Sequence, residues 1–463
     1  METLNNIVLT IQNYMSNYVL IIALLGAGLW FSFRLGFIQV RGFGEGMKRT
    51  FGGLFSKKGE AGADGMSSFQ ALATAIAAQV GTGNIAGAAT ALAIGGPGAI
   101  FWMWIAAFLG MATIYAEAIM AQKYKTVGAD GQVTGGPVYY IRAAFKGTFG
   151  KVLAGIFAIL ITLALGFMGN AVQSNSIAAS FHTAFGIPQW IMGLVVAVIA
   201  IFVFMGGMKR IAKVTETIVP FMAALYIIGS LIVIIYNYKN IPYAFASIFI
   251  GAFSPSSVVG GAAGATVKLA LTKGVARGLF SNEAGMGSTP HAHAVAKVDH
   301  PVEQGFVAMT GVFIDTFIVL NLTALVILTT KSIPTGKTGA ELSQYAFSTL
   351  YGKGGDIFVA ICMFFFAFST IIGWYFFGQA NIKYLFGPKA VKIYSAAAAV
   401  CVFLGSLAEV DLVWNMADCF NSLMVVPNIL ALFALSKVIS QVHEDYFKTE
   451  DRKSGSAGMP RPI

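Results

Sequence analysis

Polar residues interrupt an apolar segment early in the chain, and they are the first that could do chemistry. Residues 69–94 are apolar and long enough to span a bilayer, yet their centre carries Gln79, Thr82, Gly83 and Asn84. Glycine weakens a helix by about 1 kcal/mol relative to alanine, and Thr and Asn side chains can bond the backbone locally. Non-helical backbone at membrane depth is tolerated where it lines a cavity or is buried in protein. The pattern predicts a broken helix that faces a ligand, or alternatively a close helix crossing.

The chemistry that such a break offers is recognition of the charged or polar groups of a ligand. The amino end of a half-helix at Thr82 would present backbone amides and a positive dipole end to a carboxylate. Gln79 would offer an oxygen to an ammonium group. Asn170 and Gln173 are three residues apart in another apolar segment, so they share a helix face with Phe167 and are expected to join the site. Inter-helical hydrogen bonding is the alternative role for these amides.

Two acidic residues, Glu117 and Asp315, also lie well within apolar segments. Burying an acid in a membrane helix costs about 2.5–3.5 kcal/mol on insertion scales, so such residues belong to ion pathways or to buried structural pairs. His291 and His293 have no other candidate ligands beside them, and a metal site is not indicated. Glu283 is expected to pair with a basic residue in a loop. Nothing in the chain suggests an enzyme.

Composition places these residues in a polytopic helical membrane protein. Of 463 residues, 57% are hydrophobic and only 11% charged, against about 25% charged in a soluble domain. The net charge of +10 is typical of basic cytoplasmic loops rather than of nucleic-acid binding. The three cysteines lie in apolar segments without paired spacing, and the first 18 residues lack the basic region of a signal peptide.

We expect about eleven membrane spans, with the interrupted segment as the second. The basic loop after the first span, residues 34–58, is expected to be cytoplasmic, which puts the amino terminus outside and a frayed charged tail inside. A second broken helix is expected within residues 244–279, where Pro255 precedes a glycine cluster that includes Gly264. The polar stretch 280–303 is expected to be a cytoplasmic loop.

Two broken spans, five positions apart, predict an inverted repeat with its binding site at the bilayer midplane between the breaks. The expected organisation is an amino-terminal helix and basic loop (1–66), a first five-helix repeat (67–240), a second inverted one (241–436) and a tail (437–463). The halves show no residue-level identity, so the repeat rests on topology. Broken helices could also serve a passive channel for small polar solutes.

Two long motifs resemble those of a known family. Residues 281–293, SNEAGMGSTPHAH, and residues 79–87, QVGTGNIAG, are similar to the signatures of the alanine or glycine:cation symporters of prokaryotes, and the likeness covers about residues 69–428. The resemblance implies sodium-coupled uptake of alanine and glycine across a prokaryotic cell membrane. It also implies an all-α fold of the LeuT type, a five-plus-five inverted repeat with an extra amino-terminal helix. A proton-coupled carrier of this fold, using Asp315 or Glu117, is the alternative.

The resemblance also implies where sodium would bind. Carried over to this sequence, the ligands are the backbone carbonyls of Ala77, Val80 and Phe366 and the hydroxyls of Ser369 and Thr370. Oxygen-only coordination suits a hard cation. For the two hydroxyls, back-bonding to the preceding helical turn is the alternative role.

Two further positions follow from the same resemblance. A second sodium site would use Asn84, with either Thr310 or Asp315 as its partner. The residue four positions after Thr370 would face the substrate side chain, and here it is Trp374. Together with Phe167 and Ile371, an indole would leave space for glycine or alanine but not for leucine.

Overall fold

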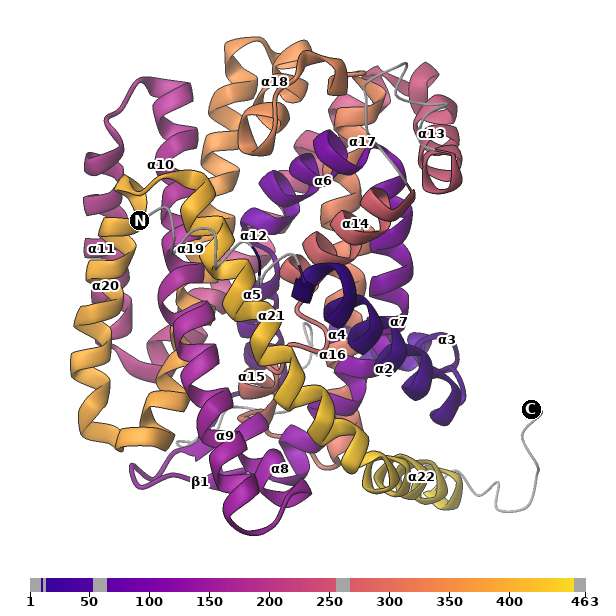
Figure 1. Cartoon of the computed structure of the whole chain (residues 1–463), viewed down its shortest axis with the longest axis vertical. Coiled ribbons are helices and arrows are strands. Elements are labelled where there is room, and N and C mark those ends of the chain that lie inside the picture. Colours follow the sequence, from indigo (N-terminus) through magenta and orange to yellow (C-terminus); the bar gives the residue numbers. More distant parts are fainter. Residues whose placement is uncertain (1–9, 11–13, 53–64, 255–266, 454–463) are drawn as a thin grey trace.

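The computed structural model describes residue 10 and residues 14–52, 65–254 and 267–453, and it is built almost entirely of helices (Figure 1). Within these ranges, one antiparallel hairpin pairs β1 (Thr126–Val127) with β2 (Val133–Thr134). Seven helices of the described chain are long and apolar enough to cross a membrane. Three shorter apolar helices accompany them, among them Leu20–Arg34 and Gln189–Phe204.

The long spans are made of the following elements: α7 (Gly98–Lys123); α9 (Gly147–Ile161), the π-helical η4 (Thr162–Gly169) and α10 (Asn170–Phe185); α12 (Gly207–Tyr236); α16 (Pro301–Val312), the π-helical η7 (Phe313–Leu320) and α17 (Asn321–Thr329); α19 (Lys353–Phe386); η9 (Pro388–Ala390) and α20 (Val391–Leu407); and α21 (Val410–Ala434).

The remaining helices are the following: η1 (Met15–Val19), α2 (Leu20–Arg34), α3 (Ile38–Arg41), α4 (Phe43–Gly52), α5 (Ser68–Gln79), the π-helical η3 (Gly83–Gly87), α6 (Ala88–Gly95), α8 (Pro137–Ala144), α11 (Gln189–Phe204), η5 (Tyr238–Asn240), α13 (Ile241–Phe253), α14 (Val267–Asn282), α15 (Pro290–Ala294), η8 (Ile333–Thr335), α18 (Gly339–Tyr351) and α22 (Ser436–Lys453).

The first broken helix is delimited by local sequence. A capping box starts α5, in which the Ser67 hydroxyl accepts the Gln70 N–H and the Gln70 side chain accepts the Ser67 N–H. The helix ends at Gln79, because Val80 takes φ −84° and ψ 88°. The chain resumes as η3 and α6, so the break predicted inside residues 69–94 is confirmed.

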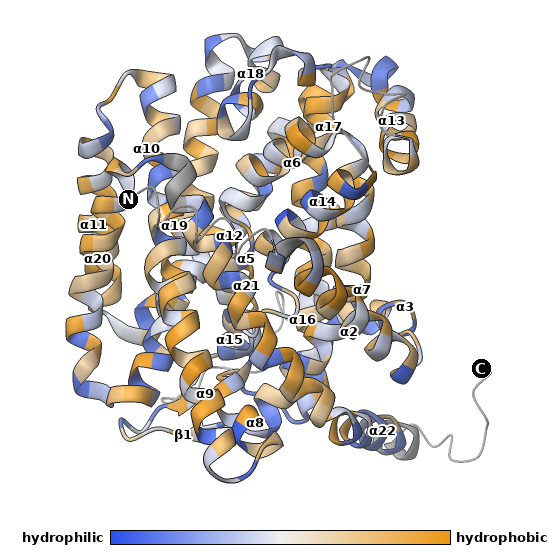
Figure 2. Ribbon diagram, in the orientation of Figure 1, coloured by the Kyte–Doolittle hydropathy of each residue, from blue (hydrophilic) through white to orange (hydrophobic). Residues whose placement is uncertain are grey.

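The two broken helices occupy the centre of the molecule, and the other spans surround them (Figure 1). Helix α7 packs on α14 and α16, while α19 packs on α5, α10 and α12. On the periphery, α11 packs on α20, and both expose apolar side chains such as Phe202 and Leu404. Hydrophobic residues dominate this outer surface, as a lipid-facing helix requires (Figure 2).

The structure shows a second break just beyond the predicted range 244–279. Helix α14 runs without interruption to Asn282, the chain then leaves the helix, and α15 begins at Pro290. Residues 278–296 are all buried and include the end of α14 and all of α15, so most of the stretch 280–303 is packed inside the protein rather than forming a polar loop. Pro255 and Gly264, the residues at which the sequence predicts a helix break, lie outside the described residues.

The carboxyl-terminal tail also differs from expectation. It was expected to be frayed, but residues 436–453 form α22, which buries Ile439 and Tyr446. These two residues are seven apart and therefore share one helix face. This amphipathic pattern is present in the sequence between Lys437 and Lys453. The many charged residues in the same stretch favoured the interpretation of a frayed tail.

Candidate functional site

The first break is held open by side chains rather than by helical hydrogen bonds. The Gly81 N–H is donated to Asn84 Oδ1 (3.0 Å), and the Thr82 N–H to Gln173 Oε1 of α10 (3.1 Å). A Cβ on Gly81 would lie 2.3 Å from Thr370 Oγ1, so only glycine fits beside α19. The Thr82 amide, which we expected to be available to a carboxylate, is therefore engaged by Gln173.

Five oxygen atoms converge where α19 passes this break. Thr370 Oγ1 lies 2.9 Å from the carbonyls of Ala77 and Phe366 and 3.4 Å from that of Val80. Ser369 Oγ lies 2.9 Å from the Phe366 carbonyl and 3.4 Å from that of Ala77. The structure thus brings together all the residues proposed as sodium ligands. Hydroxyl and carbonyl oxygens are the donors that suit a hard monovalent cation.

Four of the predicted substrate residues carry buried polar atoms without a hydrogen-bond partner among the described residues: Gln79 Oε1, Thr82 Oγ1, Asn170 Oδ1 and Gln173 Nε2. Leaving such an atom unpaired in the interior costs about 1–3 kcal/mol. The amide nitrogens of Gln79 and Asn170 do have partners. Gln79 Nε2 donates to the Asn282 carbonyl (2.8 Å), and Asn170 Nδ2 donates to the Gly166 carbonyl (3.2 Å). Two unpaired acceptors, one unpaired donor and a hydroxyl that can donate or accept match the ends of an amino acid.

Phe167 and Trp374 were both expected to face the substrate side chain, but they lie in different surroundings. The Phe167 ring packs edge-on against Tyr394 of α20, with ring centroids 5.6 Å apart. The residue of η4 that meets Trp374 is Gly169, where an added Cβ would lie 2.5 Å from the indole Cζ3. Ile371 is fully buried on α19. A π-helical turn, which sequence patterning does not reveal, rotates Phe167 away from the expected face.

The second break supplies a polar cluster around Asp315 of η7. The Asp315 carboxylate accepts hydrogen bonds from Asn84 Nδ2 (2.7 Å), from Ser281 Oγ (3.1 Å to each oxygen) and from Thr316 Oγ1 (2.8 Å). Asn84 belongs to the first break and Ser281 to the second, so one carboxylate joins both. Thr310, the alternative partner for Asn84, instead donates to the Phe306 carbonyl of its own helix (3.0 Å).

Sequence reasoning missed Ser281 because the stretch was taken for an exposed loop. The signal that could have found it is the combination of Ser281 and Asn282 at the end of an apolar helix with the buried acid at Asp315. Asn282 donates to Thr316 Oγ1 (3.2 Å), next to that acid.

Glu117 of α7 supports the backbone of the second break. Its oxygens accept the N–H groups of Gly285 (3.0 Å) and Gly287 (2.9 Å) and the side-chain amide of Asn428 on α21 (2.6 Å). Both glycines have positive φ, at 88° and 80°, which other residues rarely adopt. Glu117 is therefore a structural anchor, because it satisfies backbone N–H groups of a buried segment that forms turns rather than a helix.

Glu283 has other partners than those expected. We expected a basic partner, but the carboxylate accepts hydrogen bonds from Trp374 Nε1 and Ser288 Oγ. Among the ion pairs of the described residues, none involves Glu117, Glu283 or Asp315. His291 and His293, on α15, bond the Ser288 carbonyl (2.7 Å) and Gln304 (2.8 Å), respectively.

An ion pair and two aromatic rings lie above this centre, between α14 and α21. Arg277 pairs with Asp418 at 2.9 Å, and its guanidinium lies 4.6 Å from the centre of the Trp414 ring. Trp414 packs on Phe280 (4.9 Å), which in turn meets Trp374 edge-on (5.6 Å). These contacts join the carboxyl end of α14 to α21 and α19, and they were not predicted from the sequence.

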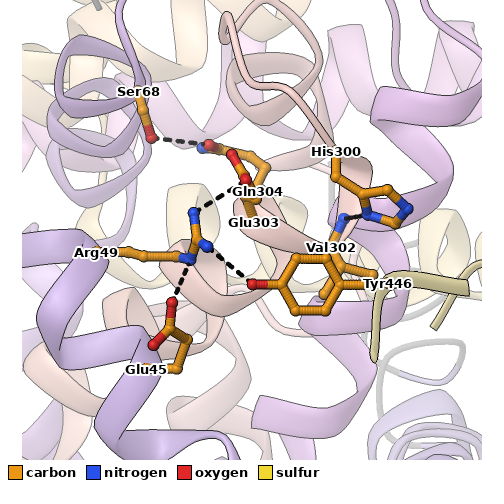
Figure 3. Close-up of polar contacts among 8 residues, drawn as sticks. All are labelled: Glu45, Arg49, Ser68, His300, Val302, Glu303, Gln304 and Tyr446. Carbon is orange, nitrogen blue, oxygen red and sulfur yellow. Dashed lines mark hydrogen bonds and ion pairs between the residues drawn. The ribbon is translucent and has the colours of Figure 1, made fainter. Parts of the chain in front are cut away.

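A separate set of polar contacts joins α4, α16, α22 and the start of α5 (Figure 3). Arg49 of α4 binds Glu45 (2.7 Å), Glu303 of α16 (3.1 Å) and the Tyr446 hydroxyl of α22 (2.8 Å). The neighbouring Gln304 accepts a hydrogen bond from Ser68 at the start of α5 (3.0 Å). The tail helix, α16 and the first broken helix are thus linked.

The chain before α5 pairs with the chain after α15. Met66 forms an isolated parallel bridge with Ala296, in which its N–H is donated to Val295 (3.0 Å) and its carbonyl accepts the Lys297 N–H (3.0 Å). Through this bridge, the ends of both broken helices are joined directly.

Comparison with known proteins gives consistent matches over nearly the whole chain. A family model described as the sodium:alanine symporter family matches residues 1–458. The chain is 43% identical to the sodium/alanine symporter AgcS of Methanococcus maripaludis, over 94% of this chain and 95% of that one. It is 42% identical to the amino-acid carrier protein AlsT of Bacillus subtilis (98% and 94%) and 40% identical to the probable sodium/glutamine symporter GlnT of the same organism (98% and 92%).

Among solved structures, a manganese transporter of Eremococcus coleocola matches with a TM-score of 0.51 at 15% identity, covering 80% of this chain and 76% of that one. At this level of identity the match concerns the fold.

Proposed function

The chain belongs to the sodium:alanine symporter family, and from this premise we propose that it couples the entry of sodium to the uptake of small neutral amino acids, alanine and glycine. Its fold is the all-helical LeuT-type inverted repeat of membrane transporters. We place the two repeats at residues 67–240 and 241–436. The work it performs is transport rather than chemical conversion.

The observation that carries this proposal is the convergence of Thr370 and Ser369 on the carbonyls that end α5. A sodium ion among these oxygens would bridge α19 to the first broken helix. The next residues, Gly81 and Thr82, are those whose backbone is held by Asn84 and Gln173. Ion binding would therefore stabilise the backbone that carries Thr82, whose unpaired hydroxyl is proposed to bind the substrate, and this makes the two affinities mutually dependent.

The unpaired polar atoms support an orientation for the amino acid. Thr82 Oγ1 and Gln173 Nε2 can donate to its carboxylate, whereas Asn170 Oδ1 and Gln79 Oε1 can accept from its ammonium. Trp374 supports a small side chain, because the indole fills space between Gly169 and Phe280. Since one relative is named for alanine and another for glutamine at similar identity, this wall is the better guide to substrate size.

The proposed mechanism is alternating access, in which the site opens to one side at a time. We propose that the end with Arg49 and α22 faces the cytoplasm, because α4 belongs to the basic stretch 34–58, in which Arg41 and Lys48 accompany Arg49. The protein would then lie in a prokaryotic cell membrane with its amino terminus outside and its carboxyl terminus inside. The organisms of the relatives support the prokaryotic assignment.

A second cation at Asp315 is supported by the carboxylate's setting. Three neutral side chains donate to it, and a cation would offset its negative charge in a low-dielectric interior. Sodium would add a second coupling ion, with Asn84 and Ser281 near it. A proton would instead make the carrier pH-coupled, as in the alternative considered from the sequence.

The test is uptake of radiolabelled alanine into proteoliposomes, with sodium and pH gradients imposed separately. We expect accumulation that requires inward sodium, saturates with alanine and is blocked by glycine. Uptake that follows a pH gradient without sodium would support the proton-coupled alternative, and flux that neither saturates nor accumulates would indicate a channel. Glutamine as a competitor tests the size limit in the same assay.

A further inference from the structure

The Trp374 indole can limit the size of the substrate only if its orientation is fixed. Contacts with residues outside its own helix must fix this orientation. The χ2 rotation of a tryptophan is broad and roughly two-fold, so a buried indole needs contacts that select one orientation. One face is determined by Gly169, whose missing side chain leaves room for the six-membered ring. Phe280 meets the indole edge-on at 5.6 Å. Neither contact provides a hydrogen-bond partner for the N–H edge of the ring.

The contact that does so is the hydrogen bond from Trp374 Nε1 to Glu283 Oε1. Indole N–H is a donor only, and a buried donor without a partner costs roughly as much as a lost hydrogen bond. Turning the ring over would lose this partner and move the six-membered ring away from Gly169. The carboxylate therefore selects one of the two orientations.

Glu283 is itself held firmly. It follows α14 directly, its N–H is donated to the Leu279 carbonyl (2.8 Å), and its second oxygen accepts Ser288 Oγ. Its φ of 58° lies in the left-handed region, which is uncommon for a residue other than glycine. A non-glycine residue in a strained conformation at a binding site is a reason to look for a role of its side chain.

The remainder of the second break does not depend on this carboxylate. Glu117 holds the backbone at Gly285 and Gly287, and Asp315 holds Ser281. Glu283 alone among the three acids bonds the side chain of Trp374. The backbone of the break and the orientation of the indole can thus be perturbed separately.

We infer that Glu283 is a specificity-determining positioning residue, which sets the size limit of the substrate site by fixing the orientation of the Trp374 indole. The inference rests on the proposed function, because it concerns the side chain of the transported amino acid. Glu283 acts through Trp374 and does not contact the substrate.

The experiment measures competition of unlabelled glycine, alanine and leucine against labelled alanine in proteoliposomes. Glu283→Ala should reduce the preference for alanine over leucine by about tenfold, the cost of an unpaired indole N–H, with an unchanged sodium dependence. Glu283→Gln should preserve the preference, since the amide oxygen still accepts from Nε1. If the alanine variant does not fold, Glu283→Gly removes the same carboxylate at a backbone position that glycine favours.

Trp374→Phe provides the decisive background, because it keeps an aromatic ring and removes the N–H. There, Glu283→Ala should change the preference no further. An equal shift in both backgrounds, or no shift with Trp374 present, would overturn the role of Glu283 while leaving the transport function intact. A wild-type protein that transports no amino acid would overturn both.

Discussion

Asn84 and Asp315 meet at the centre of the molecule, with Asn84 Nδ2 2.7 Å from Asp315 Oδ1. Asn84 also accepts the Gly81 N–H, and Asp315 also accepts the hydroxyl of Ser281. A change of charge at this one carboxylate is therefore felt by both broken helices. The hydrogen bond gives a physical route by which an ion could alter the two halves of the site together.

The first prediction concerns the proposed sodium site. Thr370→Val should abolish sodium-driven alanine uptake, because a methyl replaces the oxygen that lies 2.9 Å from the carbonyls of Ala77 and Phe366. Thr310→Val is the matched control, since Thr310 is equally buried and bonds only its own helix. Wild-type sodium dependence in the Thr370 variant, with the protein intact by size-exclusion chromatography, would refute the site.

A second prediction concerns the ends of the substrate. Asn170→Ala and Gln173→Ala should each raise the alanine dissociation constant about tenfold, as expected for a lost charge-assisted hydrogen bond of roughly 1.5–3 kcal/mol. Gln173→Ala should have the larger effect, because Gln173 also holds the Thr82 N–H. Equilibrium binding of labelled alanine measures both. Unchanged affinity in both variants would exclude α10 from the site.

Asp315→Asn should change the stoichiometry of coupling. The charge moved per alanine, measured from the reversal potential in proteoliposomes, should fall by about one if Asp315 holds a second sodium ion. If it carries a proton, the variant should lose pH dependence and keep its sodium coefficient. Thr316→Ala, which removes one donor and no charge, is the control and should affect affinity only. An Asp315 variant that matches the parent in both measurements would assign the acid a structural role.

Packing beside the indole gives a fourth prediction. Gly169→Ala places a Cβ 2.5 Å from the indole Cζ3, so the ring must shift toward neighbouring space. Glycine transport should survive this better than alanine transport, and the ratio of their KM values is the quantity to compare. Gly155→Ala, at a position of the same span with open space around it, should behave as the parent. A proportional loss for both substrates would contradict the prediction.

Docking of α22 should depend on pH through His443. Burial, and secondarily Arg41, lowers the pKa of His443 from 6.5 to about 4, and its Nδ1 lies 2.8 Å from the Tyr115 hydroxyl. The docked helix thus binds fewer protons than the free one, so docking is strongest above pH 6.5 and weakens as the pH falls from about 6.5 to 4, by at most about 3 kcal/mol. Limited proteolysis of the tail across this range is the measurement, and His443→Phe should flatten the profile.

The first break was predictable because the residues that interrupt the helix lie at the break itself. Glycines and hydrogen-bonding side chains stand within an otherwise apolar segment, and the helix ends at Gln79 as that composition requires. The oxygens of Ser369 and Thr370 followed from a motif resemblance and were then found next to the Ala77 carbonyl.

The second break could not be located in the same way. Residues 281–289 are polar and glycine-rich, which is also the composition of a surface loop. They are buried because Glu117 and Asp315, distant in sequence, satisfy their polar groups. Hydropathy measures transfer from water for each residue alone and does not register such pairing. The π-helical turn that contains Phe167 is likewise not revealed by the spacing of hydrophobic residues.

The backbone bridge between Met66 and Ala296 makes it possible to measure which helices move during transport. If α5 swings away alone to release its cargo, the two hydrogen bonds of the bridge break in every turnover, and the amides of Met66 and Lys297 become open to deuterium each time. If α5 and α15 travel as one body, both amides stay protected however fast the protein works. The exchange rate of two backbone protons, compared between an idle and a cycling carrier, thus distinguishes a hinge of one helix from a rocking pair.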